Sequence, residues 1–331
     1  MRSTAVDVAI IGAGAYGLSL AAHLCVGKLS YRIFGTPMSS WRNHMLTRTW
    51  LKSDGFASSL YDPDSASTLA QYCQEQSLPY ADVGLPVPIE TFVAYGLEFQ
   101  KRFVAQLEET EVTGVTRIPG GFELATQTGE IADTHLIARR ATIAFHQRSS
   151  EPRPIAQRLL VPRSGLGLGW RSRLCTDAPL LFHSMPSRLR RRAVQRHLGP
   201  APGWFAKSRF VGRVTSHLGT QMRQVDMRHN CVSLKFTQQD GSDTELQFDH
   251  VICATGYKVT LQRLCFIDAA PRKRMATADD VPILNRNFQS VVPGLYFVGL
   301  ASSNSFGQLC RFAYGAKFTP KRLARHLANG G

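Results

Sequence analysis

The chain has 331 residues, of which 44% are hydrophobic and 19% charged, values typical of a globular protein with one large or two ordinary domains. Its formal net charge is +15, and the densest cluster of arginines spans Arg188 to Arg196. A nucleic-acid or anionic membrane surface is one interpretation, but no nucleic-acid motif accompanies the cluster, and a solvated arginine-rich helix is simpler. An anionic substrate or an acidic protein partner fits the charge better than nucleic acid does.

Seven cysteines are scattered along the chain without a Cys-x-x-Cys pair. This spacing argues against a zinc site and indicates a reducing, cytoplasmic setting. The apolar N-terminal stretch has the composition of a signal peptide, but its glycine pattern suits a strand followed by a helix better. No other segment is long enough to cross a bilayer, so we expect a soluble protein with no membrane partner. From the spacing of the cysteines we expect no metal site.

A dinucleotide-binding fingerprint opens the chain. The β-branched run Val6 to Ile11 predicts a buried parallel strand, and Leu18 to Leu24 predicts an apolar helix. Between them Gly12, Gly14 and Gly17 form the pattern G-x-G-x-x-G, which carries weight here because strand and helix flank it. The first glycine permits the tight turn, the second lets a pyrophosphate touch the backbone, and the third lets the helix pack against the strand. Free N–H groups and the helix dipole then hold the phosphates.

The second strand departs from this pattern at its end. It is predicted over Tyr31 to Phe34 and is followed by Gly35, where an Asp or Glu usually binds the ribose hydroxyls. The adenosine ribose must therefore be held in another way, or less tightly.

Later segments alternate between helical and strand patterns. Apolar spacing predicts an amphipathic helix over Thr91 to Leu107, short helices such as Pro186 to His197, and a last helix that reaches Leu327. The remaining predicted strands are Glu111 to Arg117, Gly121 to Gln127, Ala141 to Phe145, Gln221 to Asp226, Cys231 to Gln238, Leu246 to Phe248, Asp249 to Ala254 and Gly294 to Val298.

Three separated segments share one resemblance. GAGAYG at residues 12–17, VICATGY at 251–257 and GLYFVGLASSNSFG at 294–307 resemble the two-dinucleotide-binding-domain flavoproteins, in particular the class B flavin monooxygenases and N-hydroxylating monooxygenases. The resemblance covers about residues 1–145 and 245–327. It implies an α/β fold with a Rossmann-like FAD-binding domain, in which a β-meander is inserted into a parallel sheet. In such proteins the first fingerprint binds the FAD pyrophosphate, and the last motif brings a glycine turn and a helix N-terminus to the flavin.

By position, the resemblance implies FAD contacts along the whole chain. They are Gly12, Ala13, Gly14, Tyr16 and Gly17 at the pyrophosphate, Gly35 after the second strand, Trp41, Arg42, Lys52 and Ser53 on the flavin-contacting loop, Val115 (or Val112 beside it) at the adenine, Gly256 in the Thr-Gly-Tyr turn, and Gly299, Leu300, Asn304, Ser305 and Phe306 at the isoalloxazine ring. Two of these residues have an alternative role that needs no cofactor. Trp41 is equally consistent with an aromatic side chain of the core, and Lys52 with a solvated charge on a loop.

The family also places a second glycine fingerprint on a βαβ unit that binds NADPH, and here this chain differs. Between Phe145 and Cys253 there are only scattered glycines. The run Gly165 to Gly169 has no preceding strand and suits a loop, while the prolines within Gly199 to Gly203 remove N–H donors. His146 stands where a Thr-Gly turn is expected, either at the cofactor crevice or as an ordinary loop histidine. We therefore expect the NADPH-binding unit to be missing and NADPH not to be stably bound.

These expectations divide the chain into three segments. Residues 1–146 begin the FAD-binding domain, 147–220 form a truncated, mainly helical remnant of the NADPH domain, and 221–331 complete the FAD-binding domain. Neither a nucleophile elbow nor a metal-ligand spacing supplies other chemistry, so no catalytic residue is identified.

Three functions remain open. The first is an FAD-dependent enzyme of specialised metabolism that acts on a small molecule. Its flavin is reduced by the substrate or by a flavin reductase partner, or it serves without redox chemistry. The second is an NADPH-dependent monooxygenase that binds nicotinamide transiently through Arg163, Arg171 or Arg173. The third is a non-catalytic or regulatory FAD-binding protein.

Overall fold

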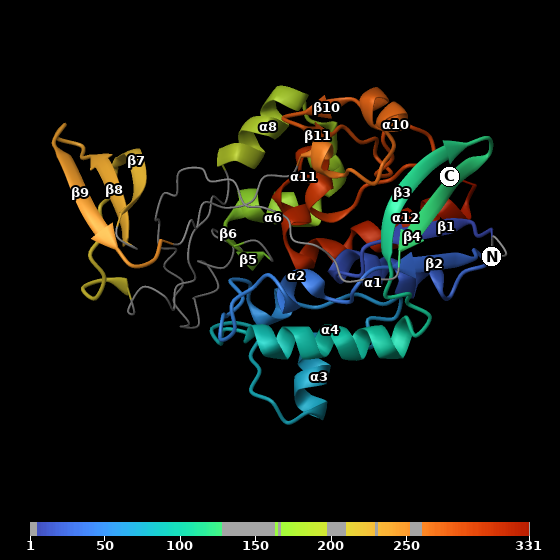
Figure 1. Ribbon diagram of the computed structural model, residues 1–331. Coiled ribbons are helices and arrows are strands. Elements are labelled where there is room, and N and C mark those ends of the chain that lie inside the picture. Colours follow the sequence, from blue (N-terminus) through green and yellow to red (C-terminus); the bar gives the residue numbers. More distant parts are fainter. Residues whose placement is uncertain are drawn as a thin grey trace. The chain divides into compact units, whose positions relative to one another are not determined.

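The computed structural model describes residues 5–127, 163–164, 167–196, 210–228, 231–251 and 260–330 (Figure 1). The chain divides into two compact units. The first comprises Met1–Asp133, Arg148–Gly199 and Val259–Gly331, and the second Thr134–Gln147 and Pro200–Lys258. This division differs from the three predicted segments, because most of the predicted helical remnant belongs to the first unit.

A parallel βαβ arrangement opens the first unit. β1 (Val8–Ile11) pairs in parallel with β2 (Tyr31–Phe34), and α1 (Ala15–Leu24) connects the two strands. Eight of the ten residues of α1 are buried, as its small and apolar side chains predict, and the helix packs against α4 and α12. β2 has the predicted bounds. β1 begins two residues later than predicted, and α1 begins three residues earlier, directly after Gly14.

The helix α4 (Ile89–Phe103) supplies much of the core of this unit. Phe92, Tyr95 and Phe99 are fully buried on one face at helical spacing, which is the pattern that predicted a helix here. The helix begins and ends earlier than predicted, because Pro88 precedes its first turn and the chain leaves helical geometry at Val104. Figure 1 shows α4 between α1 and α3 (Leu69–Glu75), and α2 (Ser39–Arg42) also packs on α4.

An antiparallel hairpin follows. β3 (Glu111–Ile118) and β4 (Gly121–Gln127) match the predicted strands to within one residue. Gly120 stands in the turn at φ +87°, a left-handed conformation that favours glycine. A bulge lies between Val112 and Gly114. The strand predicted at 141–145 lies outside the described residues.

The described part of the arginine-rich middle contains three short helices. The two-residue strands β5 (Arg163–Ser164) and β6 (Gly167–Leu168) pair antiparallel, and α6 (Trp170–Asp177), α7 (Pro179–Ser184) and α8 (Ser187–Arg196) follow. Two residues of the glycine run expected to be a loop, Gly167 and Leu168, therefore form a short strand. An antiparallel pair of this kind does not supply the parallel strand that a dinucleotide-binding βαβ unit needs.

The C-terminal part of the first unit is built from short elements. They are α10 (Ala269–Arg274), the antiparallel pair β10 (Thr277–Ala278) and β11 (Val281–Pro282), α11 (Ser303–Phe306), 3₁₀ turns between Gly299 and Lys317, and α12 (Thr319–Ala328). The predicted strand Gly294 to Val298 is wrong: only a single bridge joins Tyr296 to Gln289. The backbone N–H of Phe297 donates to the carbonyl of Phe288, so this segment folds back on its own loop.

The described part of the second unit contains an antiparallel sheet. β7 (Gln221–Arg228), β8 (Cys231–Thr237) and β9 (Asp243–Phe248) lie in that order, close to the predicted strands. Asp249 and His250, predicted to begin a further strand, have no strand geometry, and residues 252–259 lie outside the described residues. Among the helices that the structure describes, none combines the length and apolar character that a membrane span needs. The same residues contain no cluster of potential metal ligands.

Candidate dinucleotide site

The glycine turn after β1 has the backbone that the fingerprint predicts. Gly12 adopts φ +108°, and a Cβ there would have no neighbour within 4 Å, so the space above it is open. Its N–H donates to the carbonyl of Phe34 at 2.8 Å, which ties the turn to the end of β2. A Cβ on Gly17 would lie 1.9 Å from the carbonyl oxygen of Gly12. Gly17 thus allows α1 to pack directly against the turn, as expected.

The N-terminus of α1 opens onto this turn without a cap. Gly14 is the N-cap, no side chain accepts a hydrogen bond from the first turn, and no acidic residue lies in that turn. The partial positive charge of a helix N-terminus and its orphan N–H groups favour an anion. A Cβ on Gly14 would meet one atom within 4 Å, Cζ3 of Trp41 at 3.6 Å. Both the donors and the open space therefore fit a pyrophosphate.

Trp41 lies beside the fingerprint, while its neighbour Arg42 points to solvent. Trp41 is half-buried and packs edge-to-face on Phe92, with ring centroids 5.3 Å apart. It is therefore both a partly buried core aromatic and a wall of the space over Gly14. Arg42 is exposed and donates from Nη1 to the carbonyl of Pro37 at 3.4 Å.

Gly35 occupies the position where the ribose-binding acid is expected. Its φ is +121°, and a Cβ there would lie 3.5 Å from the backbone N of Ala13. The N–H of Met38 also donates to the carbonyl of Ala13 at 3.0 Å, so Gly35 belongs to a backbone turn fitted closely to the fingerprint. A side chain at this position would be strained, which gives a structural reason for the missing acid.

Glu108 is the acid held next to the end of β2, and it has another partner. Its carbonyl accepts from the N–H of Gly35 at 3.0 Å, while its carboxylate accepts two hydrogen bonds from Arg32, both 2.6 Å long. Hydrogen bonding to Arg32 holds the pKa of Glu108 below its usual range, and the same bonds raise the pKa of Arg32. To bind a ribose in place of the missing acid, this carboxylate would have to break its hydrogen bonds to Arg32.

The loop that carries Lys52 and Ser53 rests on the segment at 79–88. Lys52 is exposed, and Ser53 shares a 2.7 Å hydrogen bond with the hydroxyl of Ser58. A Cβ on Gly55 would lie 2.4 Å from the carbonyl oxygen of Ala81, so this glycine permits close contact between the two loops.

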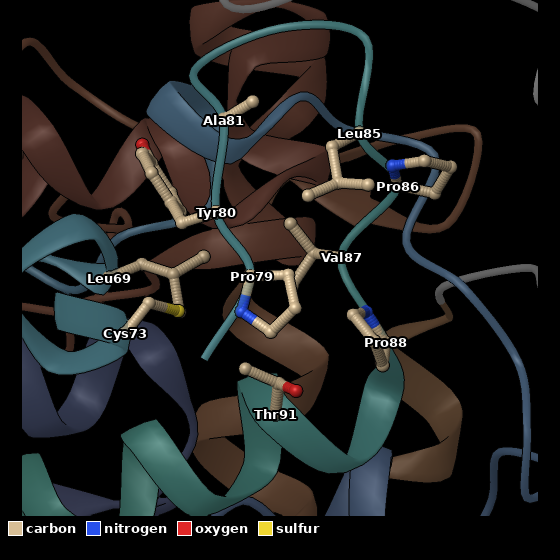
Figure 2. A pocket seen from close by; sticks show the side chains of 10 residues that line it. All are labelled: Leu69, Cys73, Pro79, Tyr80, Ala81, Leu85, Pro86, Val87, Pro88 and Thr91. Atoms are coloured by element: carbon tan, nitrogen blue, oxygen red, sulfur yellow. The ribbon is translucent and has the colours of Figure 1, made fainter. Parts of the chain in front are cut away.

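A small cavity lies behind this loop, between α3 and α4 (Figure 2). The volume that the centre of a water molecule can occupy in it is about 10 Å³. This is room for about one water and far too little for a flavin or a nucleotide. Its lining is mainly apolar and includes the buried Cys73, whose thiol pKa is raised by burial. We therefore regard it as a packing feature of the loop and not as a substrate site.

Tyr16 connects the fingerprint to the C-terminal part of the chain. Its hydroxyl donates to the carbonyls of Phe312 and Leu309, at 2.9 and 3.4 Å. A Cβ on Gly315 would lie 2.0 Å from that hydroxyl, and a Cβ on Gly299 3.3 Å from the ring. Burial raises the pKa of Tyr16 well above its usual range, so the hydroxyl stays protonated as a donor. The side chain thus serves the C-terminal turn, and only the backbone of Tyr16 remains for the predicted pyrophosphate contact.

The predicted isoalloxazine contacts fall into two groups. Leu300 is 42% exposed and directly follows Gly299, which packs on Tyr16. Asn304 instead donates from Nδ2 to the carbonyl of Ala278 at 2.9 Å, and the Ser305 hydroxyl accepts from the N–H of Leu284 at 3.2 Å. These two side chains fasten the turn to neighbouring loops, whereas Leu300 remains accessible.

Phe306 is a core residue in this structure. Its side chain is fully buried and stacks on Phe288 and His183, with ring centroids 4.0 and 4.9 Å apart. A residue enclosed by protein in this way has no free face for a flavin ring. Its side chain therefore packs the core, and a contact of this turn with the isoalloxazine ring stays a prediction.

The predicted adenine contact also has other partners. The backbone N–H of Val115 donates to Phe266 at 2.6 Å, and its carbonyl accepts from the N–H of Asp268 at 3.1 Å. Both backbone groups are thus paired within the protein, although the carbonyl oxygen keeps a second lone pair, and the adenine contact stays a prediction. Val112, the alternative beside it, is buried at the start of the bulge. Gly256 and His146 lie outside the described residues.

Sequence patterns missed the contacts that hold the C-terminal turn from behind. The carbonyl of Ser305 lies 3.3 Å from Nδ1 of His183 and accepts from Nη1 of Arg190, also at 3.3 Å. The side-chain amide of Gln308 donates to the carbonyl of Val194. Burial, followed by the charge of Arg190, lowers the pKa of His183, and burial lowers the pKa of Arg190. The amphipathic pattern of α8 was the one available signal in the sequence. It indicates that one face of the helix is buried, but it does not show which segment covers that face.

Comparisons with known proteins agree with the βαβ and glycine-turn geometry. No protein-family model matches the chain, and no curated protein matches it by sequence. Among solved structures, the ornithine N-hydroxylase of Kutzneria sp. 744 superposes with a TM-score of 0.71 at 11% identity, covering 99% of this chain and 100% of the other. The cadaverine monooxygenase of Erwinia amylovora gives 0.69 at 15% identity, over 99% and 95%.

A third structure extends the set. The flavin-containing monooxygenase from Stenotrophomonas maltophilia gives a TM-score of 0.54 at 17% identity and covers 98% of each chain. At such identities the likeness establishes the fold alone. The chain therefore has the mixed α/β, Rossmann-like fold of the class B flavin-dependent monooxygenases.

Proposed function

We propose that this chain binds FAD at its N-terminal fingerprint and is a flavin-dependent oxidoreductase that acts on a small molecule. One observation carries the proposal: the open, uncapped glycine turn before α1 is joined through Tyr16 to the turn that starts at Gly299. Two segments far apart in the sequence thus meet on one helix, as expected where one ligand spans both. The Erwinia amylovora structure is described as bound to FAD, and the Kutzneria structure as holding reduced FAD, NADP⁺ and L-ornithine.

The residues of this chain would bind and orient the cofactor. The backbone of Gly12 to Gly17 would hold the pyrophosphate, Trp41 would cover one side of it, and the accessible Leu300 would face the ring. FAD would supply the redox chemistry when bound, while the protein provides position and excludes water. Because Gly35 replaces the ribose-binding acid, the backbone contacts carry more of the affinity than is usual for this fold.

We further propose that the chain lacks its own NADPH-binding unit, so that the flavin is reduced by the substrate or by a partner protein. Two observations support this. Within the described residues, β1 and β2 are the one pair of strands joined in parallel. Arg173, a candidate for transient nicotinamide binding, pairs with Asp177 at 3.0 Å. Side chains of the other candidates, Arg163 and Arg171, lie outside the described set.

The site is tested by Gly14→Leu. Gly14 has φ −84° and ψ −173°, a conformation that any residue adopts, and its Cβ would contact only Trp41, so the fold accommodates the substitution. The leucine side chain would enter the space where the pyrophosphate is placed. We expect the Kd for FAD, measured by quenching of flavin fluorescence, to rise about tenfold or more, about 1.4 kcal/mol per tenfold.

Gly121→Ala is the matched control, since its Cβ would have no neighbour within 4 Å and it lies in the β3–β4 hairpin. This variant should bind FAD as the wild type does. Equal FAD affinity in the Gly14→Leu variant would overturn the placement of the site. Rapid flavin reduction by NADPH without oxygen would favour the NADPH-dependent alternative, and a bound flavin inert to every reductant would favour the non-catalytic one.

A further inference from the structure

The surface of α6, α7 and α8 that faces solvent combines large apolar side chains with arginines. Residues 170–196 contain seven arginines and one aspartate, without lysine or glutamate. Four large apolar side chains on these helices are strongly exposed: Trp170 (60%), Leu174 (47%), Leu181 (55%) and Leu189 (48%). Trp170 and Leu174 lie one helical turn apart on α6 and so are neighbours on its surface, and contiguous exposed apolar side chains are typical of an interaction site. We call this set, together with Arg188 and Arg192, the α6–α8 outer surface.

Two of the arginines on this surface are available to a partner. Arg188 and Arg192 are exposed and lie one helical turn apart on α8, on either side of Leu189. Within the described part of the chain, neither forms an ion pair, whereas Arg191 pairs with Asp279 at 3.9 Å. Arg190 points the other way, to the carbonyl of Ser305.

The opposite face of the same helices holds the candidate flavin turn. Val194 is buried, and its carbonyl accepts from Gln308. His183 stacks on Phe306, and Phe182 lies 3.3 Å from where a Cβ of Gly307 would stand. One layer of helix therefore separates the outer surface from the backbone of the turn that contains Ser305.

The composition of this surface favours a protein partner over nucleic acid or membrane. Arginine and tryptophan are the side chains enriched at the centres of protein interfaces, and they lie here among leucines. Leucines would gain little against a phosphate backbone. A membrane-surface helix needs a broad apolar face, but Leu189 is the single large apolar side chain exposed on α8. Arg188 and Arg192, which form no ion pair within the described residues, favour a partner with an acidic rim.

We propose that the α6–α8 outer surface docks a small acidic one-electron carrier protein, which supplies electrons to the flavin behind it. This inference rests on the proposed FAD site. Two reduced carriers each give up one electron to the cofactor. With two protons from solvent, these two electrons complete one two-electron reduction. Arg188 and Arg192 meet the acidic rim of the carrier, and Leu189 and Leu181 meet its apolar centre.

The experiment uses the FAD-loaded full chain and a plant-type [2Fe–2S] ferredoxin as the carrier. Isothermal titration calorimetry gives the Kd at two ionic strengths, and anaerobic mixing with reduced ferredoxin gives the rate of flavin reduction. Arg188→Glu/Arg192→Glu should raise the Kd about tenfold or more, slow flavin reduction to match, and flatten the salt dependence. Lys273→Glu/Arg274→Glu on α10 is the matched control, with the same change in charge at two other exposed cations. It should change the Kd less than about threefold.

Each outcome separates docking from the proposed function. Equal effects of the two double variants, or no ferredoxin binding, would overturn the docking surface. Binding of anionic vesicles or of DNA by the wild type, lost in Arg188→Glu/Arg192→Glu while ferredoxin does not bind, would assign the surface to those partners instead. Dithionite provides the independent check: a bound flavin that dithionite reduces but ferredoxin does not leaves the FAD site intact and refutes the carrier. A chain that binds ferredoxin but no FAD refutes the proposed function alone.

Discussion

Tyr16→Phe removes the hydroxyl that joins α1 to the C-terminal turn and leaves the ring in place. The hydroxyl donates to two carbonyls, Phe312 at 2.9 Å and Leu309 at 3.4 Å, and the shorter bond has normal hydrogen-bond length. Removing a donor from a partly buried carbonyl costs about 1–3 kcal/mol, and the weak second bond adds little. We therefore expect the free energy of unfolding to fall by about 1–2 kcal/mol.

The same change should weaken FAD binding, because Tyr16 positions the turn around Gly299 relative to the glycine turn. Equilibrium unfolding in urea, followed by circular dichroism, measures the stability, and flavin fluorescence measures the Kd. Tyr72→Phe serves as the control, since Tyr72 is also half-buried and packs on Tyr95, and within the described residues its hydroxyl forms no hydrogen bond to a distant turn. If Tyr16→Phe and Tyr72→Phe were equally stable and bound FAD equally, the connection through Tyr16 would carry no weight.

Two further predictions concern the first unit. Gly17→Ala places a Cβ 1.9 Å from a backbone oxygen that no side-chain rotation can relieve, so we expect a loss of about 2 kcal/mol or more in unfolding free energy; an unchanged urea midpoint would contradict the close packing of α1 on Gly12. The pKa of His183 is lowered in the folded state by burial and by Arg190, so the unfolded chain takes up its proton first as the pH falls. The free energy of unfolding should therefore decline as the pH drops below the ordinary histidine pKa of about 6.5. His183→Gln should reduce that decline. The same pH dependence in both proteins would show that the pKa of His183 does not change on folding.

Local patterns predicted the elements whose signal is contained in a few neighbouring residues. The β-branched run at β1, the glycine spacing before α1 and the apolar face of α4 each suffice to specify their element, because strand and helix periods are read over short windows. The hairpin β3–β4 follows in the same way from the turn signal of Gly120 and Gly121 between two strand patterns.

The side-chain contacts that the sequence did not predict depend on partners far away in the sequence. Ser305 meets Arg190 and His183 across 115 and 122 residues, and the hydroxyl of Tyr16 reaches Phe312 across 296. A motif states which residue types occur at a turn, but not which side chains turn inward. The motif therefore predicts Phe306 at the flavin, whereas in the fold its side chain is buried in the core. The N–H of Val115 likewise bonds to a distant residue, the carbonyl of Phe266.

The central claim is that the glycine turn before α1 holds FAD. The most direct test is to incubate the purified chain with FAD, separate it from free cofactor by gel filtration, and record the visible absorption spectrum together with the protein concentration. The account predicts flavin absorbance that elutes with the protein at about one FAD per chain and is lost in Gly14→Leu. A wild-type chain that elutes folded and colourless would contradict it.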